Sequence, residues 1–359
     1  MKAAVGLIGG YGAVGRAAAA QLAAWGRGPV LVAGRDAARA DVVLDLDDGD
    51  ALAAFCDQVE VTVNCAGPSY RVLDRVARAA LAAGSHYVDP GGDDPVHDLL
   101  TEVDTVAKTV VLSAGMLPGL TGLLPRALAV GTGAEPTSLT GYVGGRDRFT
   151  AVAAADYLAS LHNGFGRPNQ AWRAGRRSEQ ALSPLFDVDL PHFPDAAAAH
   201  PYLSTEMERL ARRLRISDLT FYNVFLGKHL LAALAEPAGD KNDGSDDSID
   251  RLTAAADLDL LGRDPHQRLV FHLDARDGTR AALVLSGHGA SELTGATVAL
   301  AACAVLDGAV PSGVHFAADV LDPLWAVERL RTAAAVQAIE IYETVTAPQD
   351  TSGFEEGEL

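Results

Sequence analysis

The chain has 359 residues, 48% of them hydrophobic and 21% charged, which is a globular composition in a length that favours two domains. Its net charge of −18 excludes a generally basic surface of the kind that binds nucleic acid. Cys56, Cys65 and Cys303 form no CxxC pair and the ten histidines show no zinc-type spacing, so we expect neither disulfides nor a metal site. No apolar run reaches about 18 residues, and we expect a cytoplasmic protein without a membrane span.

Short apolar runs alternate with stretches of helical composition over the first third of the chain. This alternation is typical of an α/β fold with a doubly wound parallel sheet, which we call Rossmann-like. We expect strands at 3–8, 29–33, 41–46, 59–64, 86–89 and 109–113, and helices at 14–25, 50–56, 72–83 and 99–108.

The pattern changes after about Leu120. Residues 164–202 are rich in Pro, Arg, Trp and His with little periodicity, and we expect a long excursion that covers a substrate site. Residues 236–250 are acidic and nearly devoid of apolar side chains, which predicts a flexible surface loop. We expect helices at 121–130 and 292–307, and antiparallel strands at 137–143, 269–273 and 281–286, the last two joined by the turn Asp277-Gly278.

A glycine-rich motif, GxGxxG, follows the first predicted strand and opens the first predicted helix. In this context Gly10 permits a tight turn, Gly12 lets the backbone touch a pyrophosphate, and Gly15 lets helix and strand pack closely. The helix N-terminus offers free N–H groups and a positive dipole end to the phosphates. The sequence therefore predicts a dinucleotide site formed by Gly10, Tyr11, Gly12, Ala13, Val14 and Gly15.

The end of the second strand indicates which dinucleotide binds. Arg35 stands where an NAD enzyme usually places an acidic residue for the ribose, and a guanidinium there can pair with a 2′-phosphate. Arg39 can assist it, so we predict NADPH as the cofactor; the alternative is a solvated Arg35 with Asp36 as the ribose ligand. Asp45, after the third strand, is a candidate to bind the adenine amine or simply a surface acid.

The fourth strand ends in Asn64, and the small residues after it are expected to line the cofactor crevice beside the nicotinamide ribose. These further candidate cofactor-binding residues are Cys65, Ala66, Gly67 and Pro68.

Several motifs together resemble the saccharopine dehydrogenase family. They are the strand-end element Asn64–Pro68, the Tyr87–Asp89 segment after the next helix and the turn Gly115–Gly119, in addition to the loop Gly10–Gly15. With that loop the resemblance spans about residues 3–130 and is weaker over 291–323. Between about 140 and 290 we find little similarity, so that region is expected to select the substrate.

The resemblance implies a division of the chain. Residues 1–122 and about 291–359 would form an NADP-binding Rossmann-like domain, and about 123–290 an inserted α+β domain for substrate and dimerisation. The active site would lie in the cleft between them, and a homodimer is expected by analogy. The family's activities include reduction of C–N bonds, of imines and of enoyl groups, and fold-level similarity does not select among them.

A reductase also needs a proton source near the acceptor. Candidate catalytic residues are Tyr70, Asp89, Tyr142 and His162. Asp89 can instead cap a turn with the glycines that follow it, Tyr142 can be a structural strand residue, and His162 can be a helix C-terminal charge. Five arginines are candidates for binding a substrate carboxylate or a carrier's phosphopantetheine, or are solvated surface: Arg146, Arg148, Arg173, Arg176 and Arg177.

Three functions remain open at this stage. The first is an NADPH-dependent reductase of an imine or thiazoline-like C=N bond in amino-acid-derived or specialised metabolism. The second is a trans-acting enoyl reductase on a carrier-bound thioester, and the third is a non-catalytic NADPH-binding sensor or assembly protein. The first predicts a compact polar pocket, whereas the second predicts a long channel with a basic docking rim.

Overall fold

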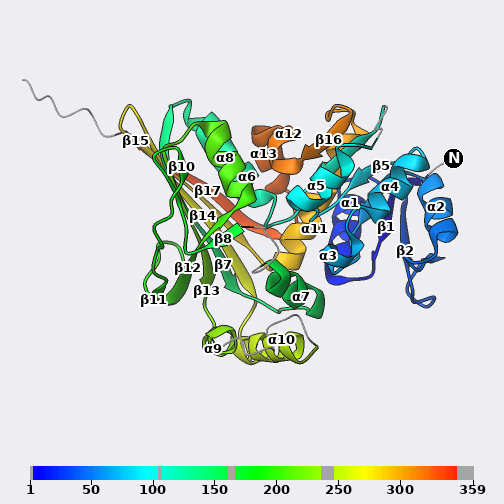
Figure 1. Ribbon diagram of the computed structural model, residues 1–359, viewed down its shortest axis with the longest axis horizontal. Coiled ribbons are helices and arrows are strands. Elements are labelled where there is room, and N and C mark those ends of the chain that lie inside the picture. Colours follow the sequence, from blue (N-terminus) through cyan, green and yellow to red (C-terminus); the bar gives the residue numbers. More distant parts are fainter. Residues whose placement is uncertain (1–2, 104–106, 161–165, 236–245, 346–359) are drawn as a thin grey trace, which may run out of the picture.

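The computed structural model describes residues 3–103, 107–160, 166–235 and 246–345. Two sheets lie side by side with helices between them and around the first one, as Figure 1 shows. The first sheet contains the strands of residues 3–112, and the second contains those of residues 136–287. Each sheet gains one further strand from the C-terminal part of the chain.

The first sheet has seven strands in the order β16-β6-β5-β4-β1-β2-β3, and each pairing is parallel. The predicted doubly wound parallel sheet is therefore confirmed. Its central strands, at residues 3–8, 59–64, 86–88 and 109–112, are mostly buried, as expected where helices cover both faces. The strands are β1 (Ala3–Ile8), β2 (Val30–Gly34), β3 (Val42–Val43), β4 (Val59–Asn64), β5 (His86–Val88), β6 (Thr109–Leu112) and β16 (Gly313–Phe316).

The helices around this sheet are α1 (Ala13–Ala24), α2 (Gly49–Asp57), α3 (Ser69–Val72), α4 (Arg75–Ala82), α5 (Asp93–Leu100), α11 (Ala290–Leu306), α12 (Ala317–Val320) and α13 (Pro323–Leu330). The helix expected at 99–108 is wrong, because α5 occupies the preceding residues. Gly92 begins it in the left-handed region, and Asp93 and Asp94 favour its first turn by interacting with the helix dipole. Pro95 is tolerated because it lies within that first turn.

The second sheet is mixed and has ten strands, seven of them in the order β10-β9-β13-β7-β14-β15-β17. The predicted hairpin is confirmed, since β14 and β15 pair antiparallel across the Asp277-Gly278 turn. The first predicted strand, β7, is antiparallel to β14 but parallel to β13, which the sequence did not indicate. The strands are β7 (Pro136–Arg146), β8 (Gly166–Pro168), β9 (Trp172–Arg173), β10 (Arg176–Arg177), β11 (Leu185–Val188), β12 (Ala197–Ser204), β13 (Asp218–Phe225), β14 (His266–Ala275), β15 (Thr279–Gly287) and β17 (Val336–Val345).

Two expectations for the middle of the chain need correction. The supposed irregular excursion at 164–202 contains five strands, β8 to β12, and β12 pairs with β13 of the second sheet. The loop expected at 236–250 ends in helix, because residues 246–250 begin α10. Residues 236–245 lie outside the described part of the chain.

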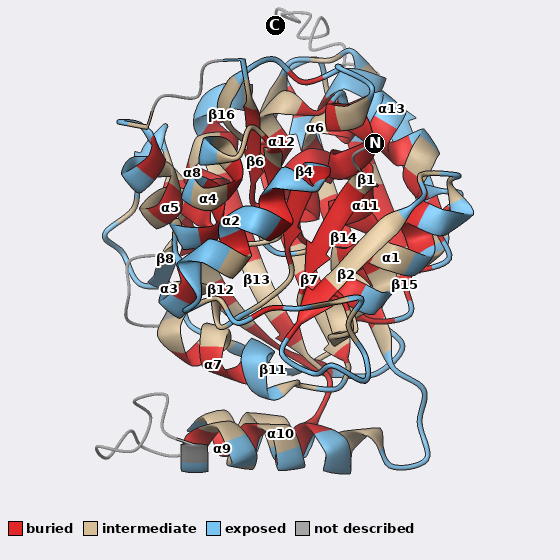
Figure 2. Cartoon of the chain, turned by 90° about the vertical axis from the view of Figure 1, so that its right-hand side faces the viewer, coloured by how far each residue is buried: buried red, intermediate tan, exposed pale blue. Residues whose placement is uncertain are grey.

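Five helices accompany the second sheet: α6 (Leu120–Thr132), α7 (Ala151–Ser160), α8 (Thr205–Leu214), α9 (Lys228–Ala235) and α10 (Asp246–Leu260). The main core is continuous between the two sheets, since Leu7 of β1, Leu123 of α6 and Phe271 of β14 belong to one buried cluster. Figure 2 shows these buried elements in the body of the molecule, with α9 and α10 below it.

The returning chain contributes to both sheets. Helix α11 packs against α1, where a Cβ on Gly295 would lie 2.5 Å from that of Ala17, and β16 extends the first sheet beside β6. However, β17 pairs with β15 at the edge of the second sheet. The expected assignment of all residues from 291 onward to the first domain is therefore incorrect for Val336–Val345, because its apolar residues complete the second sheet instead.

Candidate active site

The glycine loop connects β1 to α1 at the carboxyl edge of the first sheet. The left-handed residue of the turn is Gly9, with φ +72°, rather than Gly10. Gly10 is close-packed instead, since a Cβ there would lie 2.9 Å from Val32, and a Cβ on Gly15 would lie 2.5 Å from the Gly10 Cα. The predicted role of Gly15 in close packing thus agrees with the geometry, whereas the turn depends on a glycine one residue before the motif.

The start of α1 fits a dinucleotide pyrophosphate. Gly12 is its N-cap and provides no side-chain cap, and no acidic residue lies in the first turn, so the N–H groups of the turn that begins with Ala13 and Val14 are available to an anion. A Cβ on Gly12 would approach only the Gly9 carbonyl, at 3.1 Å, which leaves the outer side of the loop open to a phosphate.

The end of β2 presents two guanidinium groups. The Tyr11 ring packs against Gly34, and Arg39 lies 4.5 Å from the ring centroid and donates to the Tyr11 carbonyl at 2.9 Å. Arg35 is exposed, and its side chain makes no hydrogen bond or ion pair with the described residues. The Arg39 guanidinium is held in place and the Arg35 guanidinium is exposed, and two cations at this position suit the 2′-phosphate of NADP.

The two acidic residues considered beside them are engaged in turns. The Asp36 carboxylate accepts the Ala38 amide at 3.0 Å, and that of Asp45 accepts the Asp47 amide at 3.1 Å. Asp45 is exposed, so its proposed contact with adenine stays a prediction.

The loop after β4 continues the carboxyl edge. The Asn64 side-chain oxygen accepts the Ala66 amide at 3.1 Å, and the Cys65 amide donates to Ile8 of β1 at 2.8 Å, so the loop is anchored beside the glycine turn. Burial raises the pKa of the Cys65 thiol to about 12, which makes it an inert neutral group. Gly67 and Pro68, joined by a cis peptide bond, lead into α3.

Asp89 is buried at the end of β5 and fully engaged. Its carboxylate accepts the Tyr87 hydroxyl at 2.5 Å, the Gly91 amide at 2.8 Å and the Asn64 side-chain amide at 3.3 Å. Burial raises its pKa, and these hydrogen bonds counteract the shift. The arrangement favours the turn-capping role over that of a proton donor.

Tyr142 lies on the wrong face of the second sheet for the predicted role. Side chains alternate along β7, and Leu139 and Val143 enter the main core with α6. Tyr142 therefore points to the opposite face, where its ring stacks on Tyr222 with centroids 5.1 Å apart. The placement of Tyr142 in the cleft is corrected accordingly. His162 lies outside the described residues and stays a prediction.

Tyr70 lies on α3, next to a carboxylate that the sequence analysis did not single out. Asp156 of α7 accepts the Ser69 amide at 2.8 Å and also the Tyr70 amide. Burial raises the pKa of Asp156 to about 6, even though the backbone hydrogen bonds act in the opposite direction. Asp156 is the only charged residue within α7, and that isolation in an alanine-rich helix was the available signal.

A second set of contacts joins the domains at the other end of the same edge. Glu206 of α8 accepts the Gly119 amide at 2.8 Å and the Thr121 hydroxyl at 2.5 Å, so it caps the start of α6. Burial raises the pKa of Glu206 to about 7, with Asp93 adding to the shift and the Thr121 hydrogen bond opposing it.

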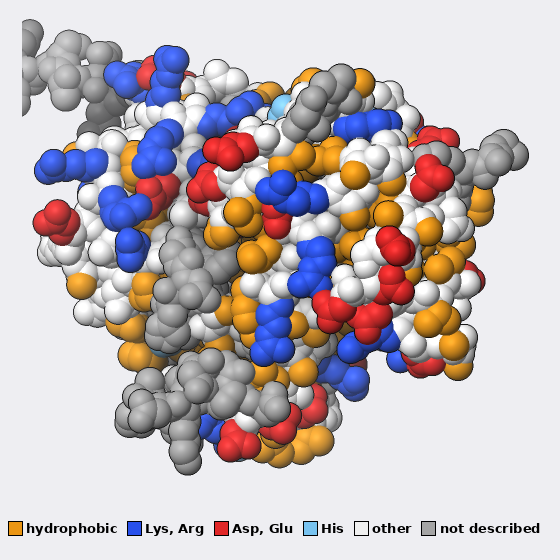
Figure 3. All heavy atoms as spheres, turned by 45° about the vertical axis from the view of Figure 1, so that its right-hand side comes forward, with side chains coloured by type: hydrophobic (Ala, Val, Ile, Leu, Met, Phe, Trp, Pro, Cys, Tyr) orange, Lys and Arg blue, Asp and Glu red, His pale blue; other side chains and the backbone are white. Residues whose placement is uncertain are grey.

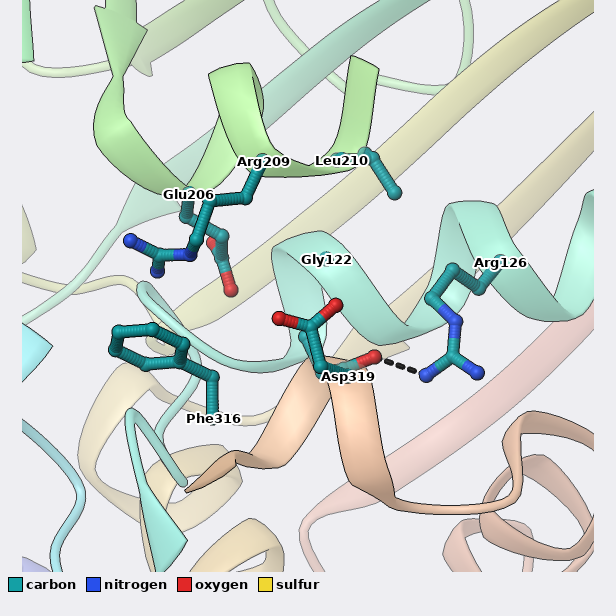
Figure 4. A pocket seen from close by; sticks show the side chains of 8 residues that line it. Gly122, Arg126, Glu206, Arg209, Leu210, Phe316 and Asp319 are labelled. Atoms are coloured by element: carbon teal, nitrogen blue, oxygen red, sulfur yellow. Dashed lines mark hydrogen bonds between the residues drawn. The ribbon is translucent and has the colours of Figure 1, made fainter. Parts of the chain in front are cut away.

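Arg209, one turn further along α8, pairs with Asp93 at 2.7 Å and with Asp94 at 2.5 Å. Its guanidinium also lies 3.7 Å from the Phe316 ring centroid. Figure 4 shows Arg209 and Phe316, together with Glu206, around a small open depression. Since its cations and carboxylates are largely paired with one another, we regard it as a structural seam between the domains.

The candidate arginines have separate positions. Arg146 is buried and bonds to Asp195 at 3.0 Å and to the Leu226 carbonyl at 2.9 Å, which is a structural role. Arg148 is exposed, next to Asp147. Within the described residues, no group of three or more metal-ligating side chains is arranged to hold a metal ion. The described helices also include none with the length and apolar character required to span a membrane.

Residues 5–111 match the family model described as the saccharopine dehydrogenase NADP binding domain. This region contains the glycine loop, both arginines after β2 and the loop after β4. A comparison with curated protein sequences found no match.

Two solved structures share the fold. One is the apo histidine-tagged saccharopine dehydrogenase (L-Glu forming) from Saccharomyces cerevisiae, with a TM-score of 0.67 and 17% identity over 95% of this chain and 100% of that one. The other is an engineered D-amino acid dehydrogenase bound to NADP+, with a TM-score of 0.50 and 14% identity over 89% of this chain and 95% of that one. The family match therefore shows an NADP-binding domain of the saccharopine dehydrogenase type over residues 5–111, and the solved structures show that the fold of the whole chain is shared with dehydrogenases.

Proposed function

We propose that the protein reduces a C=N bond of an imine or thiazoline-like substrate in amino-acid-derived or specialised metabolism. When bound, NADPH supplies a hydride. The protein must hold the acceptor carbon close to the cofactor and provide a proton for the nitrogen, because a protonated imine is the better acceptor. The cleft residues must therefore include a group that holds a proton near neutral pH.

The observation that supports this proposal is the polar group of Tyr70, Ser69 and Asp156 beside the loop after β4. Tyr70 is the candidate donor that lies on this edge without being buried, whereas Asp89 is enclosed and fully hydrogen-bonded. We therefore propose Tyr70 as the proton donor and Asp89 as a support for the loop. A group that can hold a proton suits an imine acceptor, because its nitrogen must be protonated.

A carrier-bound enoyl thioester is the alternative substrate, and one observation favours it. Arginines gather on α8 and on the β9–β10 hairpin, and Figure 3 shows basic side chains toward the upper left of the molecule, on the side of the second sheet. Some of this charge is neutralised, since Arg177 and Arg212 both pair with Glu208. The remaining cations, Arg176 among them, offer a surface to an acidic carrier.

The test is a screen of NADPH oxidation by the purified protein against two acceptor sets. One set contains imines formed from amine and keto-acid pairs together with a thiazoline, and the other contains enoyl thioesters. We expect turnover of the imine set and a clear loss of turnover in Tyr70→Phe with unchanged NADPH binding. Turnover of the enoyl set alone would replace our proposal with the alternative, and tight NADPH binding without turnover would favour a sensor or assembly protein.

We also propose that the protein is a homodimer. The outer edge strand of the second sheet exposes apolar surface, since Ile341 is 48% and Tyr342 45% exposed. Exposed apolar area at a sheet edge favours association. Light scattering coupled to gel filtration would give twice the chain mass, and a monomer at micromolar concentration would refute the dimer.

A further inference from the structure

Three helices of the second domain form a small cap with a core of its own. Leu158 of α7, Ala233 of α9 and Leu252 of α10 belong to a buried cluster that is separate from the main core. Helix α7 therefore has two faces. One packs on α9 and α10 through Ala154 and Leu158, and the other carries Val152 and Asp156, which are one turn apart. We call α7, α9 and α10 the α7 cap.

The second face of α7 contacts the first domain beside the proposed site. A Cβ on Gly67 would lie 2.5 Å from a methyl of Val152, so the absence of a side chain at Gly67 allows the close approach. Four residues later, Asp156 accepts the Ser69 amide at 2.8 Å and the Tyr70 amide. The contact joins the cap to the segment that enters α3.

Few charged groups face this carboxylate. Tyr70 and Arg71 are the titratable residues on α3, and Asp89 lies at the end of β5. The α9 and α10 helices pack on the opposite face of α7, through apolar residues. Burial raises the pKa of Asp156 to about 6, and Asp89 adds to that shift. Above this pH the carboxylate is charged and binds the two N–H groups more strongly.

We propose that Asp156 is a positioning residue for the reaction, with its carboxylate joining the α7 cap to Ser69 and Tyr70 and holding Tyr70 in place at the cleft. The role of Tyr70 rests on the proposed function. Asp156 itself forms no bond to the substrate in this proposal. It acts through the amides of α3, so its loss should reduce turnover while leaving the dinucleotide loop intact.

The first measurement is amide hydrogen exchange of the peptide covering residues 67–72, with NADPH bound, in the wild type and in Asp156→Asn and Asp156→Ala. We expect faster exchange at Ser69 and Tyr70 in both variants, and more so in Asp156→Ala, which lacks any acceptor. Asp257→Asn is the matched control, because this exposed carboxylate lies on α10 of the same cap. Unchanged exchange in both Asp156 variants would overturn the proposal.

The second measurement is steady-state kinetics with whichever acceptor the screen identifies. We expect Asp156→Asn to lower kcat by about tenfold or more, since small misplacements of a catalytic group are costly, while its affinity for NADPH stays that of the wild type. In the wild type, kcat should rise with pH through about 6 as Asp156 ionises. Asp156→Asn should lack that rise, and Asp257→Asn should keep it.

The outcomes separate this proposal from the proposed function. A wild-type kcat and pH profile in Asp156→Asn would overturn the positioning role, whatever the acceptor. If the acceptor is an enoyl thioester, the imine assignment fails and the Asp156 test proceeds unchanged. If no acceptor is turned over, the proposed function fails, and the exchange measurement alone decides whether Asp156 holds the Ser69–Tyr70 segment. Thermal unfolding monitored by circular dichroism would verify that each variant is folded.

Discussion

The glycine loop and the seam between the domains lie along the same edge of the first sheet but are built differently. In the loop the backbone itself determines the shape, because Gly9, Gly10 and Gly15 pack so closely that side chains there would collide. Along the seam, charged side chains reach across from the second domain, as in the contacts of Glu206 and Arg209, and Asp156 makes a similar contact at α3. We infer that cofactor binding depends on a rigid backbone site, whereas the substrate side depends on contacts that can vary with pH and with small displacements of the second domain.

The largest expected effect concerns the seam. Arg209→Met would leave Asp93, which is 5% exposed, as an unpaired buried carboxylate. Removing one partner of a buried ion pair costs about 3–5 kcal/mol, so urea unfolding should show a destabilisation near that size. Arg176→Met, on the exposed β10 strand, is the control and should be close to neutral. A mild effect at Arg209 would mean that the seam does not depend on this network.

A substitution in the glycine loop is expected to reduce the free energy of unfolding less than Arg209→Met does, but to abolish NADPH binding. The methyl group of Gly15→Ala would lie 2.5 Å from the Gly10 Cα and from the Gly9 carbonyl oxygen, and neither backbone atom can rotate away. Such overpacking costs about 1–3 kcal/mol, and NADPH binding should fall below detection. Gly131→Ala is the control, since its Cβ would meet nothing within 4 Å in helix α6. Retained NADPH binding in Gly15→Ala would show that the loop is adaptable.

The arginines after β2 should affect cofactor choice without affecting the fold. Arg35→Ala and Arg39→Ala each remove a cation that can bind the 2′-phosphate, at a cost of about 1.5–3 kcal/mol in NADPH binding. NADH lacks this phosphate, so its binding should be unchanged. Calorimetric titration of both cofactors measures the difference, and equal losses for NADPH and NADH would contradict the assignment.

The last effect, which is small for each unit of pH, is the pH dependence of the free energy of unfolding. Burial raises the pKa of Glu206 from an ordinary 4.5 to about 7. Between these values the folded state retains a proton that the unfolded state releases, so stability is greatest below the lower value and falls as the pH rises, by at most about 1.4 kcal/mol per unit. Urea midpoints across this range should show the fall in the wild type and a weaker one in Glu206→Gln. A stability that rises with pH would contradict the buried carboxylate.

The first domain could be predicted from the sequence because its structure is encoded locally. The strands at 3–8 and 59–64 are confirmed to the residue, since the first is an apolar run that ends in glycines and the second carries valine at every other position. Apolar periodicity predicted a helix at 99–108, whereas α5 spans Asp93–Leu100. The start of α5 is set by the acidic pair after Gly92, and it tolerates a proline in its first turn, so apolar periodicity does not indicate it.

The second domain and the substrate side could not be predicted in the same way. Strands such as β8 and β11 have only three and four residues and pair with β12 instead of forming long apolar runs, so residues 164–202 carry little local pattern. Tyr142 was misplaced because the face of β7 that meets α6 is decided by tertiary packing. Asp156 was missed because its partners, Ser69 and Tyr70, precede it by more than 80 residues.

The most direct test of the cofactor site is a fluorescence titration of the purified protein with NADPH and NADH side by side. Arg35, Arg39 and the open start of α1 predict saturable NADPH binding that is at least about tenfold tighter than NADH binding, the ratio expected from one charge-assisted contact. Equal affinity for the two cofactors would contradict the role of the arginines, and no binding of either would contradict the assignment of the glycine loop itself.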